Sequence, residues 1–255
     1  MGSLFTDWDA WMIAAALAAA MLAGWAAGWW WGRRQPKAAS EAPASKFNDA
    51  SMAILGLLLA FTFSMSLSKH DQRRLMVVTD SNSIGDFYTC ASLVQEPVRQ
   101  KLQGEIRAYV EHRLALAKER IGDPESQKSL HEIQELQNRM QALVSEAIAG
   151  GTPVVVPLVN TLNEVTSSHA ARLAAVRDRL APSIVMLLFL SAIISMALMG
   201  AQQGASGEHH FGATLGFVIL VSLVVYVTLD LNQPQRGLIT VSQEPMQRLL
   251  AGMGE

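Results

Sequence analysis

Four apolar runs without a charged side chain constrain this 255-residue chain more than any other feature. A helix needs about 20 largely apolar residues to cross about 30 Å of hydrocarbon. The runs reach or approach that length, and they are 11–31, 50–67, 183–199 and 211–229. Because a helix satisfies its own backbone hydrogen bonds inside a bilayer, these runs predict four transmembrane helices.

The charged residues gather between the second and third runs. Only 16% of the chain is charged, against about 25% in soluble domains. The stretch from Lys69 to Arg179 nevertheless holds 14 Lys or Arg and 14 Asp or Glu. Proline and glycine boundary signals divide this stretch into helices expected near 70–95, 97–121, 124–149 and 153–180.

These patterns predict an all-α membrane protein with four transmembrane helices and a long helical extramembrane bundle between the second and third. The first and last bundle helices directly adjoin spans, so each is a candidate continuation of its span as a rod. The expected parts are an N-terminal anchor with a mobile loop (1–49), the second transmembrane helix (50–68), the bundle (69–181), the third and fourth transmembrane helices (182–230) and a C-terminal tail (231–255).

Basic residues give the expected orientation. With four spans, the N-terminus, the bundle and the tail share one side of the membrane. Eight Lys or Arg flank the spans on that side, and four lie in the loop after the first span. The positive-inside rule therefore predicts a cytoplasmic bundle. The first span taken alone indicates the opposite orientation, because no basic residue precedes it.

Small residues follow one face of the second run at intervals of four. A face of this kind lets another helix approach closely in a membrane. The residues are Gly56, Ala60, Ser64 and Ser68.

A second face of the same run is bulky and apolar, with hydroxyl groups beside it. Such a face is able to line an oligomeric pore, and rings of apolar side chains can gate a pore by dewetting. The ordinary alternative is a lipid- or protein-facing helix whose hydroxyls bond back to their own backbone. The candidate pore-lining residues are Leu55, Leu59, Thr62, Phe63 and Ser66.

Polar residues continue along the chain beyond this run. Arg73 belongs to a basic cluster, and Asp80, Asn82 and Ser83 form a polar patch in an otherwise periodic helix. We take these four residues as candidates for a charged vestibule that concentrates ions at a pore mouth. The alternatives are a cluster that anchors the helix end by snorkelling and a solvated helix face.

The tail begins with a turn signal after the fourth span. Its motif consists of Asp230, Pro234, Arg236 and Gly237. Pro and Gly suit a turn, across which Asp230 and Arg236 are expected to approach each other. We interpret the motif as a structural hook that packs the tail against the bundle.

Several function classes lack support. A net charge of −2 offers no basic field for nucleic acid, and the single Cys90 excludes an intrachain disulfide. The chain contains no phosphate-binding loop, dinucleotide fingerprint or catalytic motif, so no enzyme activity, cofactor or metal is expected. No charge lies inside a span, which disfavours a proton-coupled transporter.

Several separated motifs resemble the bacterial bestrophin-like integral membrane family. They occur in order at 57–61, 69–74, 80–85, 96–99, 109–111 and 230–245. The resemblance covers roughly residues 50–250, with the first span outside its best-matching part. Through this family the chain is distantly similar to the bestrophin ion channels. Their acidic calcium clasp has only Asp230 and Glu244 as counterparts here, which leaves calcium gating unsupported.

The resemblance implies a homo-oligomeric channel, expected to be a pentamer, that passes small anions through a pore lined by the second span. Bestrophins have a neck of three apolar residues spaced four apart. One frame for it consists of Leu55, Leu59 and Phe63. A second frame consists of Leu57, Phe61 and Met65. We prefer the first frame because it lies beside Thr62 and Ser66.

Two hypotheses follow from the sequence. The first is this channel, in the bacterial inner membrane, with membrane lipid, other copies of itself and small inorganic ions as partners. The second is a non-conducting scaffold or signalling module that presents the cytosolic bundle to a partner. Stoichiometry separates them, because a pore needs a ring of protomers.

Overall fold

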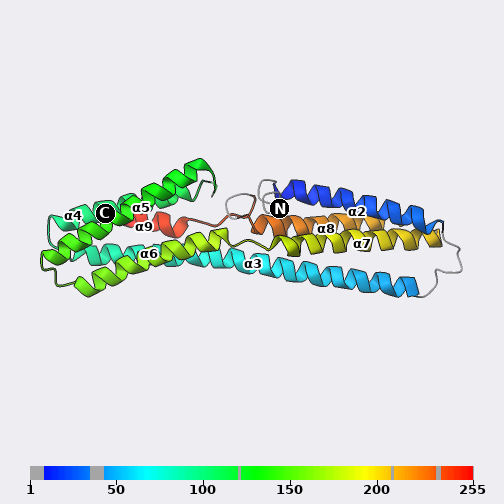
Figure 1. Ribbon diagram of the computed structural model, residues 1–255, viewed down its shortest axis with the longest axis horizontal. Coiled ribbons are helices and arrows are strands. Elements are labelled where there is room, and N and C mark those ends of the chain that lie inside the picture. Colours follow the sequence, from blue (N-terminus) through cyan, green and yellow to red (C-terminus); the bar gives the residue numbers. More distant parts are fainter. Residues whose placement is uncertain (1–8, 35–42, 120–121, 208–209, 234–236, 255) are drawn as a thin grey trace. The chain divides into compact units, whose positions relative to one another are not determined.

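The computed structural model describes residues 9–34, 43–119, 122–207, 210–233 and 237–254 (Figure 1). Within these ranges every regular element is a helix, which confirms the all-α fold class. The helices are α2 (Ala10–Gly32), α3 (Pro43–Ser92), α4 (Val98–Leu116), α5 (Pro124–Ala149), α6 (Val155–Arg177), α7 (Pro182–Ser206), α8 (Phe211–Leu231) and α9 (Glu244–Gly252).

Four helical stretches are long and apolar enough to cross a membrane. They contain the four predicted runs, in α2, the first half of α3, α7 and α8. The prediction of four spans from uninterrupted apolar sequence is therefore confirmed at the level of length and composition, and these helices indicate an integral membrane protein.

Helix α3 continues far beyond its apolar run, as one of the two predicted rods. Its 50 residues correspond to roughly 75 Å of helix, more than twice the thickness of a bilayer core. The expected continuation of the third span into the last central helix is wrong, because α6 ends at Arg177 and α7 begins at Pro182. Proline disfavours helical backbone at the preceding residue, and Ala181 is extended with ψ of 128°.

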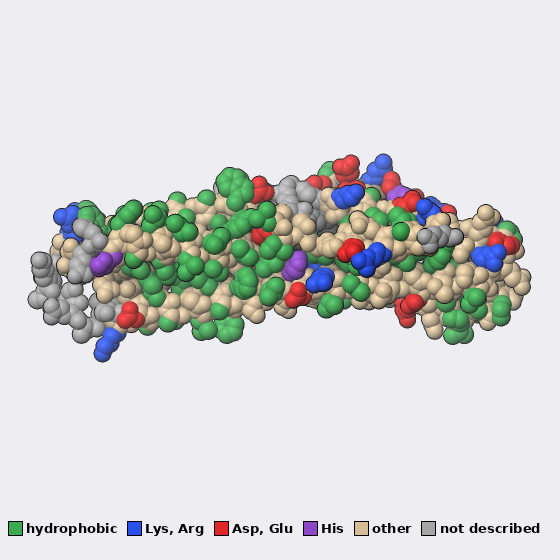
Figure 2. Space-filling view, turned by 180° about the vertical axis from the view of Figure 1, so that it is seen from behind, with side chains coloured by type: hydrophobic (Ala, Val, Ile, Leu, Met, Phe, Trp, Pro, Cys, Tyr) green, Lys and Arg blue, Asp and Glu red, His purple; other side chains and the backbone are tan. Residues whose placement is uncertain are grey.

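The chain forms two compact units, and α3 contributes to both. The span unit comprises Met1–Lys69 and Arg179–Ile239. The central unit comprises His70–Asp178 and Thr240–Glu255. Figure 2 shows many hydrophobic side chains on the visible face of the span unit, whereas Lys, Arg, Asp and Glu are frequent on the central unit.

The span unit is held together by close backbone contact between α2 and α7. A Cβ atom at Gly28 would lie 1.9 Å from the carbonyl oxygen of Ala197. A Cβ atom at Gly200 would lie 2.1 Å from the carbonyl oxygen of Trp25. Since no side chain fits at these distances, glycine is required on both helices, in the manner of small-residue packing in membranes.

The central unit has its own hydrophobic core, formed by the second half of α3 with α4, α5, α6 and α9. Helix α4 contributes a buried apolar stripe that includes Leu102, Ile106 and Tyr109. Helix α9 lies in the predicted tail but was not itself predicted. It contributes Met246 to this core, and Met253 directly after it also lies there, which confirms the prediction that the tail packs against the central helices.

Candidate functional site

Three of the five candidate pore-lining residues point into their own protomer. Leu55 is 1% exposed and belongs to the core of the span unit. The Ser66 hydroxyl is buried and donates to the Thr228 carbonyl of α8 at 2.9 Å. The buried Thr62 hydroxyl bonds back to the Leu58 carbonyl at 2.8 Å, as the ordinary alternative anticipated.

The remaining two candidates, Leu59 and Phe63, are half-buried on the same side of α3. A pore shared by several protomers needs a face that the protomer's own helices leave uncovered. The preferred frame does not meet that condition. The second frame does, because Leu57, Phe61 and Met65 are 56%, 63% and 41% exposed. Burial therefore moves the candidate pore face of α3 to the second frame.

The small-residue face of α3 is also uncovered in the protomer. All four of its residues are exposed, and a Cβ atom added at Gly56 would meet nothing within 4 Å. Within the protomer, close helix approach occurs between α2 and α7, and a close partner for the small-residue face of α3 stays a prediction. Glycines spaced four apart signalled the α2–α7 contact: Gly24, Gly28 and Gly32 on α2, and Gly200 and Gly204 on α7.

Arg73 is a buried anchor and does not line a vestibule. Its side chain is 2% exposed, and its Nε donates to the Ala175 carbonyl at 3.1 Å. Its Nη2 donates to the Asp178 carbonyl at 2.7 Å. Both acceptors lie at the C-terminal end of α6, where the last carbonyls have no partner within the helix and favour a cation. Arg73 thereby ties α3 to the end of α6.

Asp80 is the centre of a buried ionic network that joins α3 to α4 and α6. Its carboxylate is fully buried and accepts from the guanidinium of Arg113, from Arg172 at 2.8 Å and from the Ser168 hydroxyl at 3.0 Å. Arg172 also donates to Gln243, just before α9, at 2.5 Å. The network therefore connects four segments that are distant in the sequence.

The charges within this network are strongly coupled. Burial alone would raise the pKa of Asp80, but the guanidiniums of Arg113 and Arg172 hold it below its usual value. Burial and then Arg113 lower the pKa of His169 to about 4, so this imidazole is neutral at pH 7. These residues lie outside the apolar runs of α3 and α7. A carboxylate fixed in this way serves the fold and is not available to passing ions.

The predicted polar patch thus divides between the interior and the surface. Asp80 and Ser83 are buried, and the Ser83 hydroxyl bonds to the Thr79 carbonyl of its own helix at 3.1 Å. Asn82 is exposed and lines a pocket of about 520 Å³ with Asp86 and Arg248, between α3 and α9. Burial within the protomer counts against a vestibule role for Arg73, Asp80 and Ser83. The vestibule stays a prediction for Asn82.

The tail motif is built around Asp230. Its buried carboxylate accepts the backbone N–H groups of Leu238 at 3.0 Å and Ile239 at 2.9 Å. Gly237 has φ of +97°, and a Cβ atom there would lie 1.8 Å from Asp230 Oδ1, so only glycine fits. Pro234 and Arg236 lie outside the described residues, and the expected approach of Arg236 to Asp230 stays a prediction.

The fold and these faces define a class: an all-α protein with four candidate membrane spans and a charged helical unit inserted after the second. The family model of the bestrophin-like domain matches residues 14–246. The chain therefore belongs to the bestrophin-like family. The match begins inside the first span, so it extends further towards the N-terminus than the expected range of roughly 50–250. No curated protein and no solved structure gives a significant match.

Proposed function

We propose that the chain assembles into an oligomeric ion channel whose pore is lined by the outer face of α3. The observation that carries the proposal is the exposure of this helix. In the most apolar window of α3, 17% of residues are buried, against 28–33% in the other candidate spans. Much of the surface of α3 is therefore left uncovered within one protomer.

The chemistry of that face suits a gated pore. Leu57, Phe61 and Met65 recur every four residues, so they form three successive layers along the helix. In a ring of protomers each layer becomes an apolar constriction that hinders ion passage by excluding water. The adjoining stripe from Gly56 to Ser68 has small side chains, which allow neighbouring copies of α3 to pack closely around the axis.

The finer properties of the channel rest on family membership and charge counts. Bestrophin-like membership supports a homopentamer that passes small anions in a bacterial inner membrane. The eight-to-four distribution of flanking basic residues supports a cytoplasmic, extramembrane location for the central helices. The balance of 14 basic and 14 acidic residues in this region does not itself select the sign of the ion.

The test is ion flux through purified protein in liposomes, with the oligomeric mass measured on the same sample. We expect anion-selective flux from a ring-sized oligomer. A cation-selective ring would retain the pore and overturn the anion assignment. A monomer or dimer that passes none of several salts would overturn the channel and favour the scaffold hypothesis, in which the central helices bind a cytosolic partner.

A further inference from the structure

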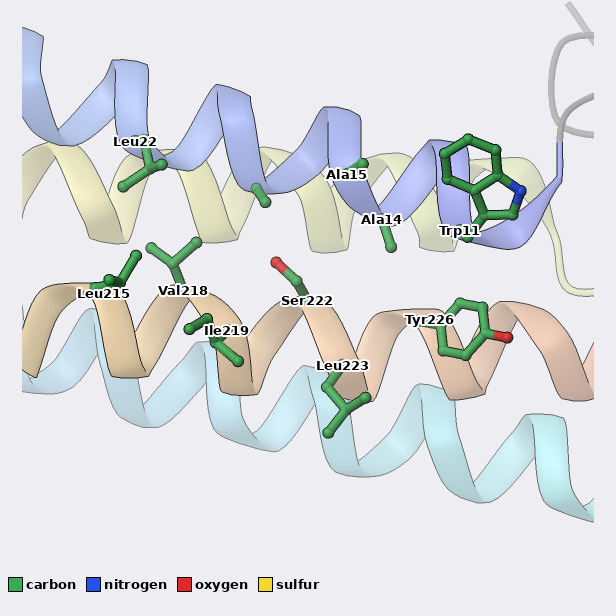
Figure 3. A pocket seen from close by; sticks show the side chains of 11 residues that line it. Trp11, Ala14, Ala15, Leu22, Leu215, Val218, Ile219, Ser222, Leu223 and Tyr226 are labelled. Carbon is green, nitrogen blue, oxygen red and sulfur yellow. The ribbon is translucent and has the colours of Figure 1, made fainter.

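An open groove of about 420 Å³ runs between α2 and α8 on the span unit (Figure 3). Between Trp11 and Leu22 its α2 wall consists of alanines, among them Ala15 and Ala18. Its α8 wall carries larger aliphatic side chains such as Val218 and Ile219. The alanines leave space that leucines at the same positions would fill, and nearly all of the lining is apolar.

The dimensions of the groove select the kind of occupant. Trp11 and Leu22 lie at its two ends, roughly 16 Å apart along α2. Spread over that length, the volume of about 420 Å³ leaves a cross-section of roughly 26 Å². A helix with its side chains is about 10 Å across and needs roughly 80 Å². The groove is therefore too narrow to enclose a helix of a second copy, and its elongated, apolar form suits one hydrocarbon chain.

The side chains at one end of the groove carry an N–H or O–H group, and those at the other end carry none. Figure 3 shows Trp11 and Tyr226 together at one end, and Leu22 with Leu215 at the other. Trp11 lies in the first turn of its span. Tryptophan and tyrosine favour the membrane interface, where the ring is buried and the N–H or O–H donor meets polar groups. The apolar part extends for about half of the roughly 30 Å hydrocarbon thickness, the depth of one leaflet.

We propose that this groove binds one acyl chain of a membrane glycerophospholipid in each protomer, with the lipid's ester and phosphate oxygens beside Trp11 and Tyr226. The chain lies along the alanines of α2 and ends near Leu22 and Leu215. This site is separate from the pore face of α3, and it does not depend on whether the protein conducts ions.

The test compares two exposed alanines on α2, only one of which lines the groove. Ala15 lines it, whereas Ala16 does not. Wild-type protein purified in mild detergent is expected to retain one phospholipid per chain in native mass spectrometry. Ala15→Phe, which fills the groove, is expected to lower the retained fraction about tenfold, equivalent to about 1.4 kcal/mol of binding. Ala16→Phe is expected to retain lipid as the wild type does.

A variant of Ser222 distinguishes a bound acyl chain from a bound polar ligand. Its hydroxyl oxygen lies in the groove, buried and without a hydrogen-bond partner. An acyl chain needs no contact with this hydroxyl, so Ser222→Ala should leave lipid retention unchanged. Loss of the bound species in Ser222→Ala would overturn the acyl-chain assignment. Equal retention in Ala15→Phe and wild type, or a change of oligomeric mass in Ala15→Phe alone, would overturn the site itself.

Discussion

The span unit and the central unit are held together by opposite means. In the span unit, α2 and α7 approach until their glycines touch the partner backbone, as Gly28 does at Ala197. In the central unit, a buried carboxylate at Asp80 is shared by two guanidiniums among apolar side chains. The first arrangement depends on shape, and the second combines hydrophobic burial with a specific ionic contact.

The difference follows from the composition of the two units, because the span helices carry uncharged apolar runs and the central helices are charged. Lipid tails are as apolar as leucine side chains, so helices in a bilayer gain little from burying apolar surface, and close contact decides their packing. In the proposed extramembrane location, the charged helices of the central unit gain from apolar burial, which is not directional. A buried ionic network penalises every arrangement that leaves one of its charges alone. We infer that this network selects the register of α3, α4 and α6.

Removing the central carboxylate should have the largest effect. Asp80→Asn leaves the guanidiniums of Arg113 and Arg172 buried beside each other without a counter-charge. We expect a loss of about 3–5 kcal/mol in the stability of the central unit, measured by denaturant unfolding in detergent. Asp86→Asn changes an exposed carboxylate on the same helix and is the matched control. Equal stability of the two variants would show that the network contributes nothing.

Lowering the pH should have a smaller effect on folding stability. The pKa of His169 is lowered to about 4 in the folded protein, against about 6.5 in the unfolded chain. Between these values only the unfolded chain binds the proton, so stability falls as pH is lowered from about 6.5 to 4, by about 3 kcal/mol at most from this group. His169→Gln should flatten the thermal-unfolding profile over this range.

The control for pH is His131, which is exposed on α5. His131→Gln should preserve the wild-type slope. A slope that persists in His169→Gln would assign the pH dependence to other groups.

The packing of the span unit is tested by one added methyl group. Gly28→Ala places a Cβ atom against the Ala197 carbonyl and should cost about 1–3 kcal/mol through overpacking. Gly216→Ala, on α8 and away from the small-residue stripe of α3, meets open space and should stabilise the protomer by up to about 1 kcal/mol, because alanine is the better helix former. Thermal unfolding in detergent measures both variants. Similar shifts for both would refute close α2–α7 contact as the basis of packing.

The spans were predictable because an uncharged apolar run of this length has few other uses. Which face of α3 points into the protomer was not predictable, because bulky apolar residues occupy both of its faces. Only contacts such as that of Ser66 with α8 distinguish the two faces. Arg113 stands at helical spacing from the apolar residues Ile106 and Tyr109, which is a sequence signal of a buried charge. Its partners, Asp80 and His169, are 33 and 56 residues away in the chain, so their contact required the fold.

The most direct test of the channel compares two phenylalanines of α3 in liposome flux. Phe61 is 63% exposed on the outer face, and Phe63 is half-buried on the face toward the protomer. If the outer face forms the neck, Phe61→Ala should widen it and raise anion flux severalfold, whereas Phe63→Ala in correctly assembled protein should conduct as the wild type does. Higher flux in Phe63→Ala with no change in Phe61→Ala would contradict this assignment and return the pore to the Leu55 frame.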